Sequence, residues 1–273
     1  MRKFNNKPVL FLDSGIGGIP YCRDFLDRNG NEEVCYIADR EHFPYGLCSK
    51  EELIAILSAL TEKLITAADP KIIVIACNTA TICALEHLRR SFNHVPFVGT
   101  VPAVKPAVMT SHSGKVGILG SQRTINDTYS HKLAESLGFH GDILGVPATE
   151  LIEFVEQRFD SASGREKTDI VRKYINIFHE HGVDTIVLAC THFLYLQEEF
   201  RKEASPQITI LDSIAGITKR IEYLLDENDS LLRSETNFKP AHRLLLTGES
   251  PPDSFWQKRA QALGFKLDLL KDT

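Results

Sequence analysis

Two short hydrophobic segments repeat one pattern far apart in the chain. The first, Ile72–Thr79, reads IIVIACNT, and the second, Thr185–His192, reads TIVLACTH. Each is an unbroken apolar run rich in β-branched residues, which is typical of a strand buried on both faces of a parallel sheet. Each run ends in Ala-Cys and then turns polar. Open α/β sheets bind ligands beyond the carboxyl ends of their strands, so we expect Cys77 and Cys190 to belong to a site.

Strand and helix patterns alternate along almost the whole chain, which predicts an α/β fold of mainly parallel sheets with helices on both faces. The first half contains further predicted strands at Val9–Leu12, Val34–Ala38 and Val95–Gly99, and helices at about Pro20–Asp27, Lys50–Ala68 and Thr79–Phe92. The second half contains predicted strands at Val116–Gly120, Asp142–Val146 and Ile208–Leu211, and helices from Ser121–Thr124 to Leu137, at Ala148–Phe159, at Arg165–His181 and up to Asp226.

The second half restarts with the pattern of the first, which indicates a duplicated α/β unit. Ser14 and Cys77 are separated by nearly as many residues as Ser121 and Cys190. The proline-containing stretch 100–107 is a candidate crossing between domains, and 227–239 is a predicted polar loop. The last strands, Arg243–Thr247 and Lys266–Leu269, and the helix Ser254–Leu263 are too few for a separate domain. We therefore expect a discontinuous first domain of residues 1–100 plus 212–273, and a second domain of residues 101–211.

Composition limits what this fold can do. The chain has 273 residues, 43% of them hydrophobic, and no apolar run approaching the roughly 20 residues of a membrane helix. It lacks the features of a signal peptide, so we expect a cytoplasmic protein whose six cysteines are thiols. A net charge of −5 gives no basic surface for nucleic acid. These properties favour a small-molecule substrate and no nucleic-acid or membrane partner.

Polar turns follow several of the predicted strands. The first, Asp13–Gly18, precedes a helix, where backbone N–H groups and the helix dipole favour an anion; a tight turn that needs glycine only for its backbone angles is the alternative. The second, Pro44–Gly46, is a rigid turn that holds an aromatic hydroxyl at the same edge, or an ordinary loop. Cys77 precedes a helix, and a helix amino terminus favours the thiolate.

Several chemistries could use the two cysteines. A cysteine hydrolase could use Cys190 with His192, but it leaves Cys77 and the symmetry unexplained. A redox dithiol usually has both cysteines on one turn. A zinc site of Cys77, Cys190 and His192 lacks an obvious fourth ligand. A nonenzymatic amino-acid-binding module needs neither thiol.

Inversion of a stereocentre accounts for both cysteines. Without a cofactor, one group must remove a proton from one face of a carbon while a similar group returns a proton to the other. Two cysteines on equivalent strands meet this requirement, with Asp13 as the natural partner of Cys77 and His192 that of Cys190. The polar turns offer hydroxyl and N–H donors to stabilise the carbanion. The residues favour this isomerase, and leave the hydrolase or amidase and the binding module as alternatives.

Five motifs give the chain a resemblance to a known family. They are LDSGIGG at 12–18, PYG at 44–46, ACNTA at 76–80, the strand and SQRT turn at 116–124, and ACTH at 189–192. In this order and over nearly the whole chain, they resemble the glutamate racemases of the cofactor-independent aspartate/glutamate racemase superfamily. The resemblance implies two α/β domains with the active site between them, often in a homodimer, no cofactor or metal, and a supply of D-glutamate for peptidoglycan.

The resemblance also implies residue roles. Cys77 and Cys190 are the acid/base thiols, and Asp13 and His192 assist them. The carboxylates and the ammonium of glutamate are held by residues of the polar turns, namely Ser14, Pro44, Tyr45, Gly46, Asn78, Thr79, Thr124 and Thr191, while Asp39 and Ser121 line the site.

Substrate choice follows from two positions. Aspartate racemases are similar but have A-C-N-T-x-H at the first cysteine and C-T-E at the second, where this chain has Thr81 and His192. Glutamate is thus the better match, and another acidic amino acid such as aspartate is the alternative. The family's assisting acidic residue corresponds to Glu153 or Glu156, and the sequence does not decide between them. The chain departs from the family pattern at Ser121 and in the GTVPAVKPA stretch at 99–107.

Overall fold

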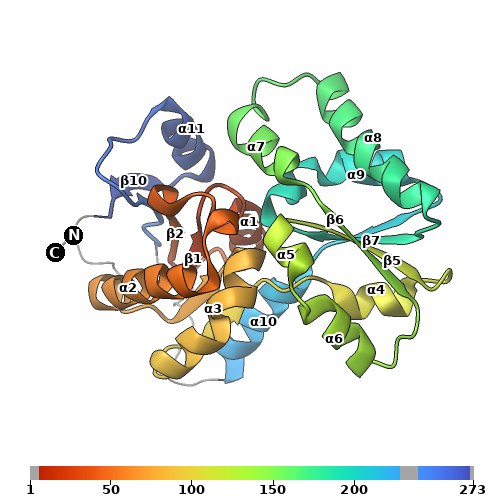
Figure 1. The fold of residues 1–273 in the computed structure, drawn as a ribbon. Coiled ribbons are helices and arrows are strands. Elements are labelled where there is room, and N and C mark those ends of the chain that lie inside the picture. The colour runs from red at the N-terminus through yellow and green to blue at the C-terminus, as the bar shows by residue number, and fades with distance from the viewer. Residues whose placement is uncertain (1–5, 228–238, 271–273) are drawn as a thin grey trace. The chain divides into compact units, whose positions relative to one another are not determined.

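The computed structural model describes residues 6–227 and 239–270, so the predicted loop at 227–239 lies almost wholly outside the described residues. Strands and helices alternate along the chain (Figure 1). The chain divides into two compact units, residues 1–100 with 214–273, and residues 101–213. Each unit has its own parallel sheet with flanking helices, which confirms the predicted α/β class.

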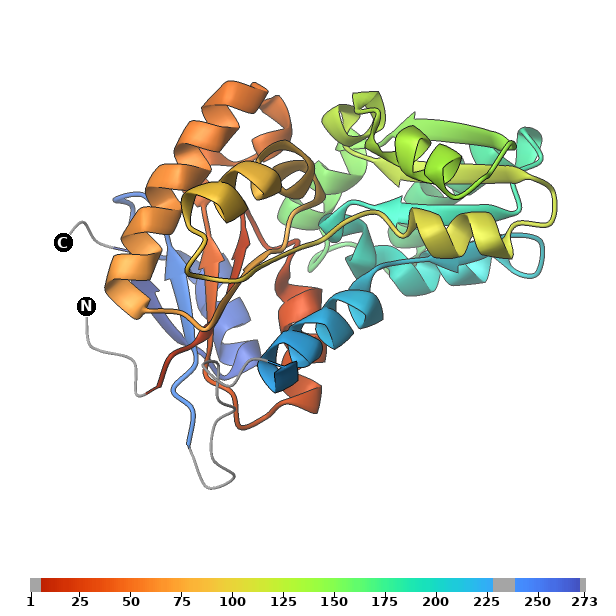
Figure 2. The ribbon, with the colours of Figure 1, turned by 90° about the horizontal axis from the view of Figure 1, so that it is seen from below.

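The first unit is built on a six-stranded parallel sheet in the order β10-β9-β2-β1-β3-β4. Its strands are β1 (Val9–Asp13), β2 (Val34–Ala38), β3 (Ile72–Ile75), β4 (Phe97–Gly99), β9 (Arg243–Leu246) and β10 (Lys266–Leu269). Figure 2 shows the C-terminal strands, in blue, beside the N-terminal strands, in red and orange. The prediction that the last strands complete the first sheet is therefore confirmed.

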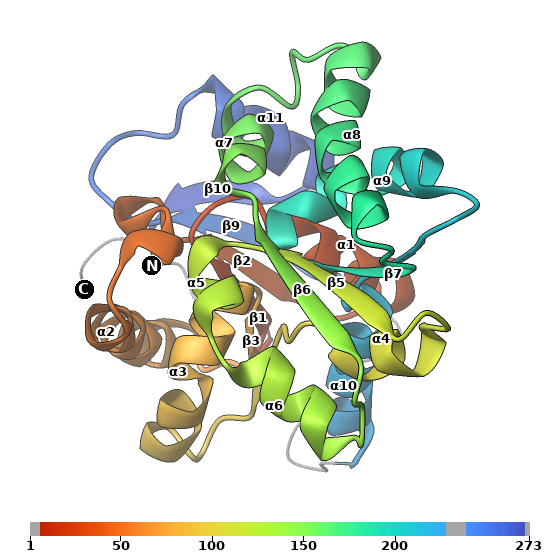
Figure 3. The same cartoon turned by 45° about the vertical axis from the view of Figure 1, so that its right-hand side comes forward.

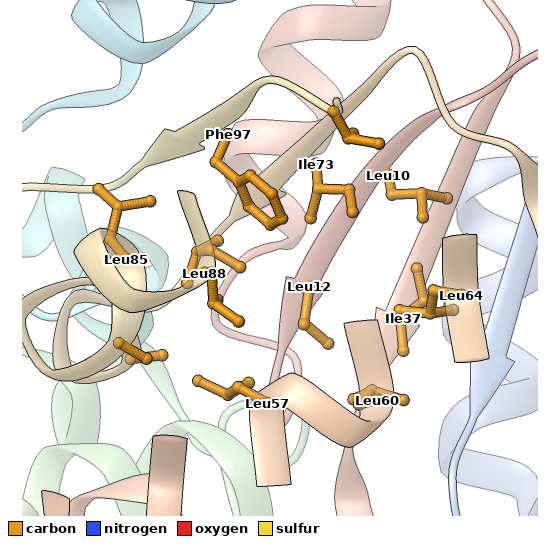
Figure 4. Packing of buried hydrophobic residues seen from close by; sticks show 14 of the residues in the cluster. Leu10, Leu12, Ile37, Leu57, Leu60, Leu64, Ile73, Leu85, Leu88 and Phe97 are labelled. Atoms are coloured by element: carbon orange, nitrogen blue, oxygen red, sulfur yellow. The ribbon is translucent and has the colours of Figure 1, made fainter. Parts of the chain in front are cut away.

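Helices cover both faces of this sheet. They are α1 (Ile19–Arg28), α2 (Lys50–Ala68), α3 (Asn78–Ser91), α10 (Ile214–Glu227) and α11 (Ser254–Leu263). Successive side chains of a strand point to opposite faces, so Leu10 and Leu12 of β1 pack with the leucines of α2 and α3 (Figure 4). Phe11 points the other way and contacts Phe25 of α1, with 5.8 Å between ring centroids.

The second unit has a four-stranded parallel sheet in the order β6-β5-β7-β8. Its strands are β5 (Lys115–Gly120), β6 (Asp142–Pro147), β7 (Thr185–Ala189) and β8 (Thr209–Leu211), and its helices are α4 (Val104–Thr110), α5 (Gln122–Asn126), α6 (Tyr129–Ser136), α7 (Thr149–Gln157), α8 (Gly164–Glu180) and α9 (Gln197–Ala204). Figure 3 shows β5 beside β6 and α8 beside α9. Buried residues of β5, β7, α4 and α6 form one core cluster.

The two sheets share a strand order. In chain order within each unit, β2-β1-β3-β4 and β6-β5-β7-β8 both read second, first, third, fourth, and all neighbours are parallel. Cys77 follows β3 and Cys190 follows β7, so the two cysteines occupy equivalent places in the two sheets. This topology agrees with the duplication inferred from the sequence.

Three segments differ from the sequence prediction. The single helix expected up to Leu137 is two helices, because the backbone at Asp127 is extended and its carboxylate accepts the N–H of Tyr129. The proposed crossing at 100–107 is partly helical, since α4 begins at Val104. Helix α9 was not predicted. Among the helices in the described ranges, none combines the length and apolarity of a membrane crossing.

Candidate active site

In the first unit, the predicted site residues lie at the carboxyl ends of neighbouring strands. Asp13 is the last residue of β1 and is fully buried, and its carboxylate accepts the N–H of Gly15 at 3.1 Å and the hydroxyl of Ser14 at 3.4 Å. Strand β3 pairs with β1, and Cys77 follows its end by two residues. The structure therefore brings the Asp13 and Cys77 segments to one sheet edge, as predicted.

The glycine turn after Asp13 is fixed by Tyr36 of β2. The hydroxyl of this buried tyrosine donates to the carbonyl of Gly15 at 2.8 Å and accepts the N–H of Gly18 at 3.1 Å. A Cβ atom at Gly18 would lie 2.7 Å from the Cβ of Ala76, next to the catalytic candidate Cys77. The N–H groups of Gly15 and Gly18 are thus used within the protein, which favours the tight-turn interpretation over an anion site at this helix terminus.

Cys77 precedes the first residue of α3 with an extended backbone, and its side chain is partly exposed. The next side chain, Asn78, is 3% exposed, yet neither its amide nitrogen nor its amide oxygen has a hydrogen-bond partner among the described residues. Buried amides are normally paired, because an unpaired one costs about 1–3 kcal/mol. The amide of Asn78 is therefore available to hydrogen-bond a ligand.

The Pro44–Gly46 turn is a short 3-10 segment whose tyrosine points inward. Tyr45 is 1% exposed, and its hydroxyl donates to the carboxylate of Asp39 at 2.8 Å. Burial, followed by the charge of Asp39 and the hydrogen bond to it, raises the pKa of Tyr45 well above its ordinary value. The phenol therefore stays protonated. The sequence predicted an aromatic hydroxyl at this edge but not its partner.

In the second unit, Ser121 follows β5 and caps α5. Its hydroxyl accepts the N–H of Thr124 at 3.2 Å and donates to the hydroxyl of Thr124 at 3.0 Å, and both side chains are buried. Thr191, directly after Cys190, is buried as well, as is Thr79 on the first turn of α3 in the other unit. These hydroxyls lie at strand ends, where the sequence placed them.

Cys190 belongs to a chain of three polar groups. Its sulfur lies 3.8 Å from Nδ1 of His192, and Nε2 of the same imidazole lies 2.8 Å from a carboxylate oxygen of Glu156 on α7. Burial alone would lower the pKa of His192, but its hydrogen bonds and charge interactions with Cys190 and Glu156 outweigh burial and hold this pKa well above the ordinary value. The imidazole therefore favours its protonated form, with Nδ1 facing the sulfur of Cys190.

The structure distinguishes the two acidic residues, Glu153 and Glu156, that the sequence left undecided. Glu156 contacts His192, whereas the side chain of Glu153 is exposed. The two residues are three positions apart on one helix, so only the packing of α7 against the segment after Cys190 separates them.

Each unit places a thiol after the equivalent parallel strand, and the thiol of the second unit lies next to an imidazole and a carboxylate, groups suited to proton transfer. The family model of Asp/Glu/hydantoin racemases matches residues 21–220. The chain is 39% identical over 211 residues to a glutamate racemase of Treponema pallidum, covering 77% of this chain and 78% of the relative. It is 34% identical to the glutamate racemase of Roseiflexus sp. over 91% of this chain and 89% of that one.

Solved structures show the same similarity. A glutamate racemase of Bacillus anthracis superposes with a TM-score of 0.82 at 26% identity, covering 97% of this chain and 96% of that one. The Escherichia coli glutamate racemase, solved with L-glutamate and the activator UDP-MurNAc-Ala, gives a TM-score of 0.83 at 26% identity, covering 97% of both chains. The chain belongs to the Asp/Glu/hydantoin racemase family and is an amino-acid racemase, an isomerase that acts on a small molecule.

Proposed function

We propose that this protein interconverts L-glutamate and D-glutamate by proton transfer at Cα between Cys77 and Cys190, with no cofactor and no metal. The observation that carries the proposal is the Cys190–His192–Glu156 chain, because it gives one thiol a charged partner suited to a base. The relatives that match most of this chain are glutamate racemases, which supports glutamate as the substrate.

Each direction of the reaction uses both thiols. One cysteine, as thiolate, takes the proton from Cα, and the electron pair of the broken C–H bond remains on the carbon next to the carboxylate. The other cysteine, as thiol, gives its proton to the opposite face and becomes the thiolate. Asp13 and His192 adjust the protonation of Cys77 and Cys190 respectively. Such a weakly acidic carbon needs fixed dipoles that stabilise the carbanion.

The substrate is bound by polar groups at the carboxyl ends of the strands. Asn78, with an unpaired buried amide, can both donate to a carboxylate and accept from the ammonium group. The hydroxyls of Ser14, Thr79, Thr124 and Thr191 and the Pro44–Gly46 turn complete the proposed set, with Ser121 behind Thr124. A homodimer, a cytoplasmic location and a role in supplying D-glutamate for peptidoglycan remain predictions from the sequence and the family.

Racemisation of glutamate is tested by incubating the purified protein with L-glutamate in heavy water, without added pyridoxal phosphate or metal. We expect D-glutamate to form with deuterium at Cα. Chiral chromatography measures the D-glutamate, and mass spectrometry measures the deuterium. L-Aspartate in a parallel incubation tests the alternative substrate. D-Glutamate without deuterium at Cα, or a product other than glutamate, would contradict the proposal.

A thiol hydrolase is the second candidate, because its nucleophile, base and orienting carboxylate could be Cys190, His192 and Glu156. The two functions differ in their need for Cys77. In a racemase, Cys77→Ser and Cys190→Ser should each reduce turnover at least a hundredfold. A hydrolase would tolerate Cys77→Ser, so an active Cys77→Ser variant would favour hydrolysis. Mutation of Cys22, which is buried in the core, to Ala provides a cysteine control outside the site.

A further inference from the structure

Thr247 directly follows strand β9 and lies against the end of β2 and the loop after it. The N–H of Thr247 donates to the carbonyl of Ala38 at 3.2 Å, and its carbonyl accepts Nε of Arg40 at 2.8 Å. Its hydroxyl donates to the carboxylate of Asp39 at 2.6 Å and accepts the N–H of Glu41 at 3.2 Å. All the polar groups of this one residue are therefore used by four consecutive residues, Ala38 at the end of β2 and residues 39–41 of the loop after it.

The carboxylate of Asp39 connects Thr247 to the proposed substrate site. One carboxylate oxygen accepts the hydroxyl of Thr247, and the other accepts the hydroxyl of Tyr45 at 2.8 Å. Nδ1 of His42 lies 3.0 Å from both oxygens, and the N–H of Asp39 donates to the carbonyl of Asp13 at 2.8 Å. Asp39 is fully buried, so the direction of its carboxylate is set by these partners.

We propose that Thr247 is a positioning residue of the active site, whose hydroxyl fixes the Asp39 carboxylate so that this carboxylate orients Tyr45 and the Pro44–Gly46 turn. The role of that turn in holding glutamate rests on the function proposed above. Thr247 lies over 200 residues along the chain from Asp39. The contact thus gives the C-terminal strands a part in substrate binding besides completing the sheet.

A cavity of about 690 Å³ borders this network and allows a sharp test. Asp39, His42 and Thr247 lie in its wall together with apolar side chains of α2 and β10 that include Leu60 and Leu269. If Thr247 is shortened to alanine, water from the cavity can reach Asp39 and donate in place of the hydroxyl. Valine has nearly the same shape as threonine, so it fills the space and leaves the carboxylate one donor short.

The relative KM values of Thr247→Val and Thr247→Ala therefore distinguish a positioning role from a packing role. For Thr247→Val we expect KM for glutamate to rise about tenfold with kcat within about threefold of wild type. The hydrogen bond to the Asp39 carboxylate and the one from the Glu41 N–H are both lost, while both thiols are untouched. Thr247→Ala should raise KM less, and Thr247→Ser should restore wild-type values. A residue that only packs would show the reverse order, with alanine worse than valine.

Thr61 supplies a matched control. It is a fully buried threonine of α2 in the same unit, and its hydroxyl has no hydrogen-bond partner among the described residues. Thr61→Val makes the same chemical change without breaking a hydrogen bond between described residues, so KM and kcat should stay at wild-type values. Equal kinetics for Thr247→Val and Thr61→Val, or Ala more damaging than Val at 247, would overturn the proposal.

A second readout does not depend on racemase activity. With 3-fluorotyrosine placed at position 45 alone, the fluorine resonance should shift in Thr247→Val and stay in place in Thr247→Ser and Thr61→Val. If the resonance moves as expected but the wild-type protein does not racemise glutamate, the hydrogen-bond network is supported and the proposed function is wrong. An unmoved resonance in Thr247→Val contradicts the positioning role whatever the activity.

Discussion

A buried histidine, His192, links the thiol of Cys190 to the carboxylate of Glu156, which lies 36 positions before the histidine in the chain. His192 bonds to Glu156 and lies against Cys190, and the two acidic neighbours together outweigh the effect of burial on the pKa of the imidazole. Glu156 acts through His192 and is a positioning residue.

Replacing Glu156 tests this relation. Glu156→Gln keeps the size but removes the negative charge, so the pKa of His192 should fall and the imidazolium should be lost at a lower pH. We expect kcat/KM to fall about tenfold or more, since one pKa unit is about 1.4 kcal/mol. The alkaline limb of the pH–rate profile should also move to lower pH.

The raised pKa of His192 should also make the free energy of unfolding depend on pH. A raised folded-state pKa of His192 adds stability below the unfolded pKa of about 6.5, and this gain is lost as the pH rises through the folded value. The difference in free energy of unfolding between wild type and Glu156→Gln should therefore be largest at acidic pH and shrink in alkali. Glu153→Gln is the matched control. A pH profile of Glu156→Gln that coincides with that of Glu153→Gln would refute the relation.

The sequence predicted the thiols and their polar turns because motifs at strand ends carry that information locally. It could not choose between Glu153 and Glu156, because both share one helix face and the choice depends on how α7 packs beside the segment after Cys190. The roles of Thr247 and Tyr36 were not predicted from the sequence, for a related reason. Their hydroxyls act on loops that follow other strands, and only the strand order β9-β2-β1 brings them there.

At the scale of elements, strand positions followed directly from the hydrophobic pattern. Strand β2 and helix α2 have the predicted bounds, Val34–Ala38 and Lys50–Ala68. A capping box at Ser49 and Glu52 fixes the start of α2. The helix expected up to Leu137 failed because a local side-chain bond at Asp127 competes with helical backbone bonds, and apolar periodicity does not reveal such competition.

One glycine of β5 tests how closely the second sheet and its helix are packed. A Cβ atom at Gly117 would lie 2.6 Å from two ring atoms of the fully buried Phe178 on α8. We expect Gly117→Ala to lower the free energy of unfolding by about 1–3 kcal/mol, because the core must shift to admit the methyl group. Chemical denaturation measures the loss.

Two further variants complete this test. Gly164→Ala is the control, since no atom lies within 4 Å of a Cβ atom at that position, and it should leave stability unchanged or slightly higher. Adding Phe178→Leu to Gly117→Ala should cost less than the sum of the single changes, because the smaller side chain relieves the clash. Additive losses in the double variant would show that Gly117 does not limit the packing of α8.

At the scale of the whole molecule, the chain leaves the first unit after Thr100 and returns to it at Ile214. Asp212, just before the return, bonds to Gln197 and Arg201 of α9. These contacts fasten the end of the second unit to its own last helix. The six-stranded sheet of the first unit is therefore assembled from segments at both ends of the chain, while the second unit is continuous.

A continuous unit with its own sheet and core should fold alone. Residues 101–213 contain all four strands of the second sheet, its helices, and the core cluster formed by β5, β7, α4 and α6. A segment of this length is large enough for a stable single domain. We expect this fragment to unfold cooperatively in urea with a free energy of about 5 kcal/mol, and Gly117→Ala to lower its midpoint as in the full chain. Circular dichroism in the near and far ultraviolet measures both. A gradual transition without near-ultraviolet signal would mean that the second unit needs the first in order to pack, and that duplication of strand order did not preserve independent folding.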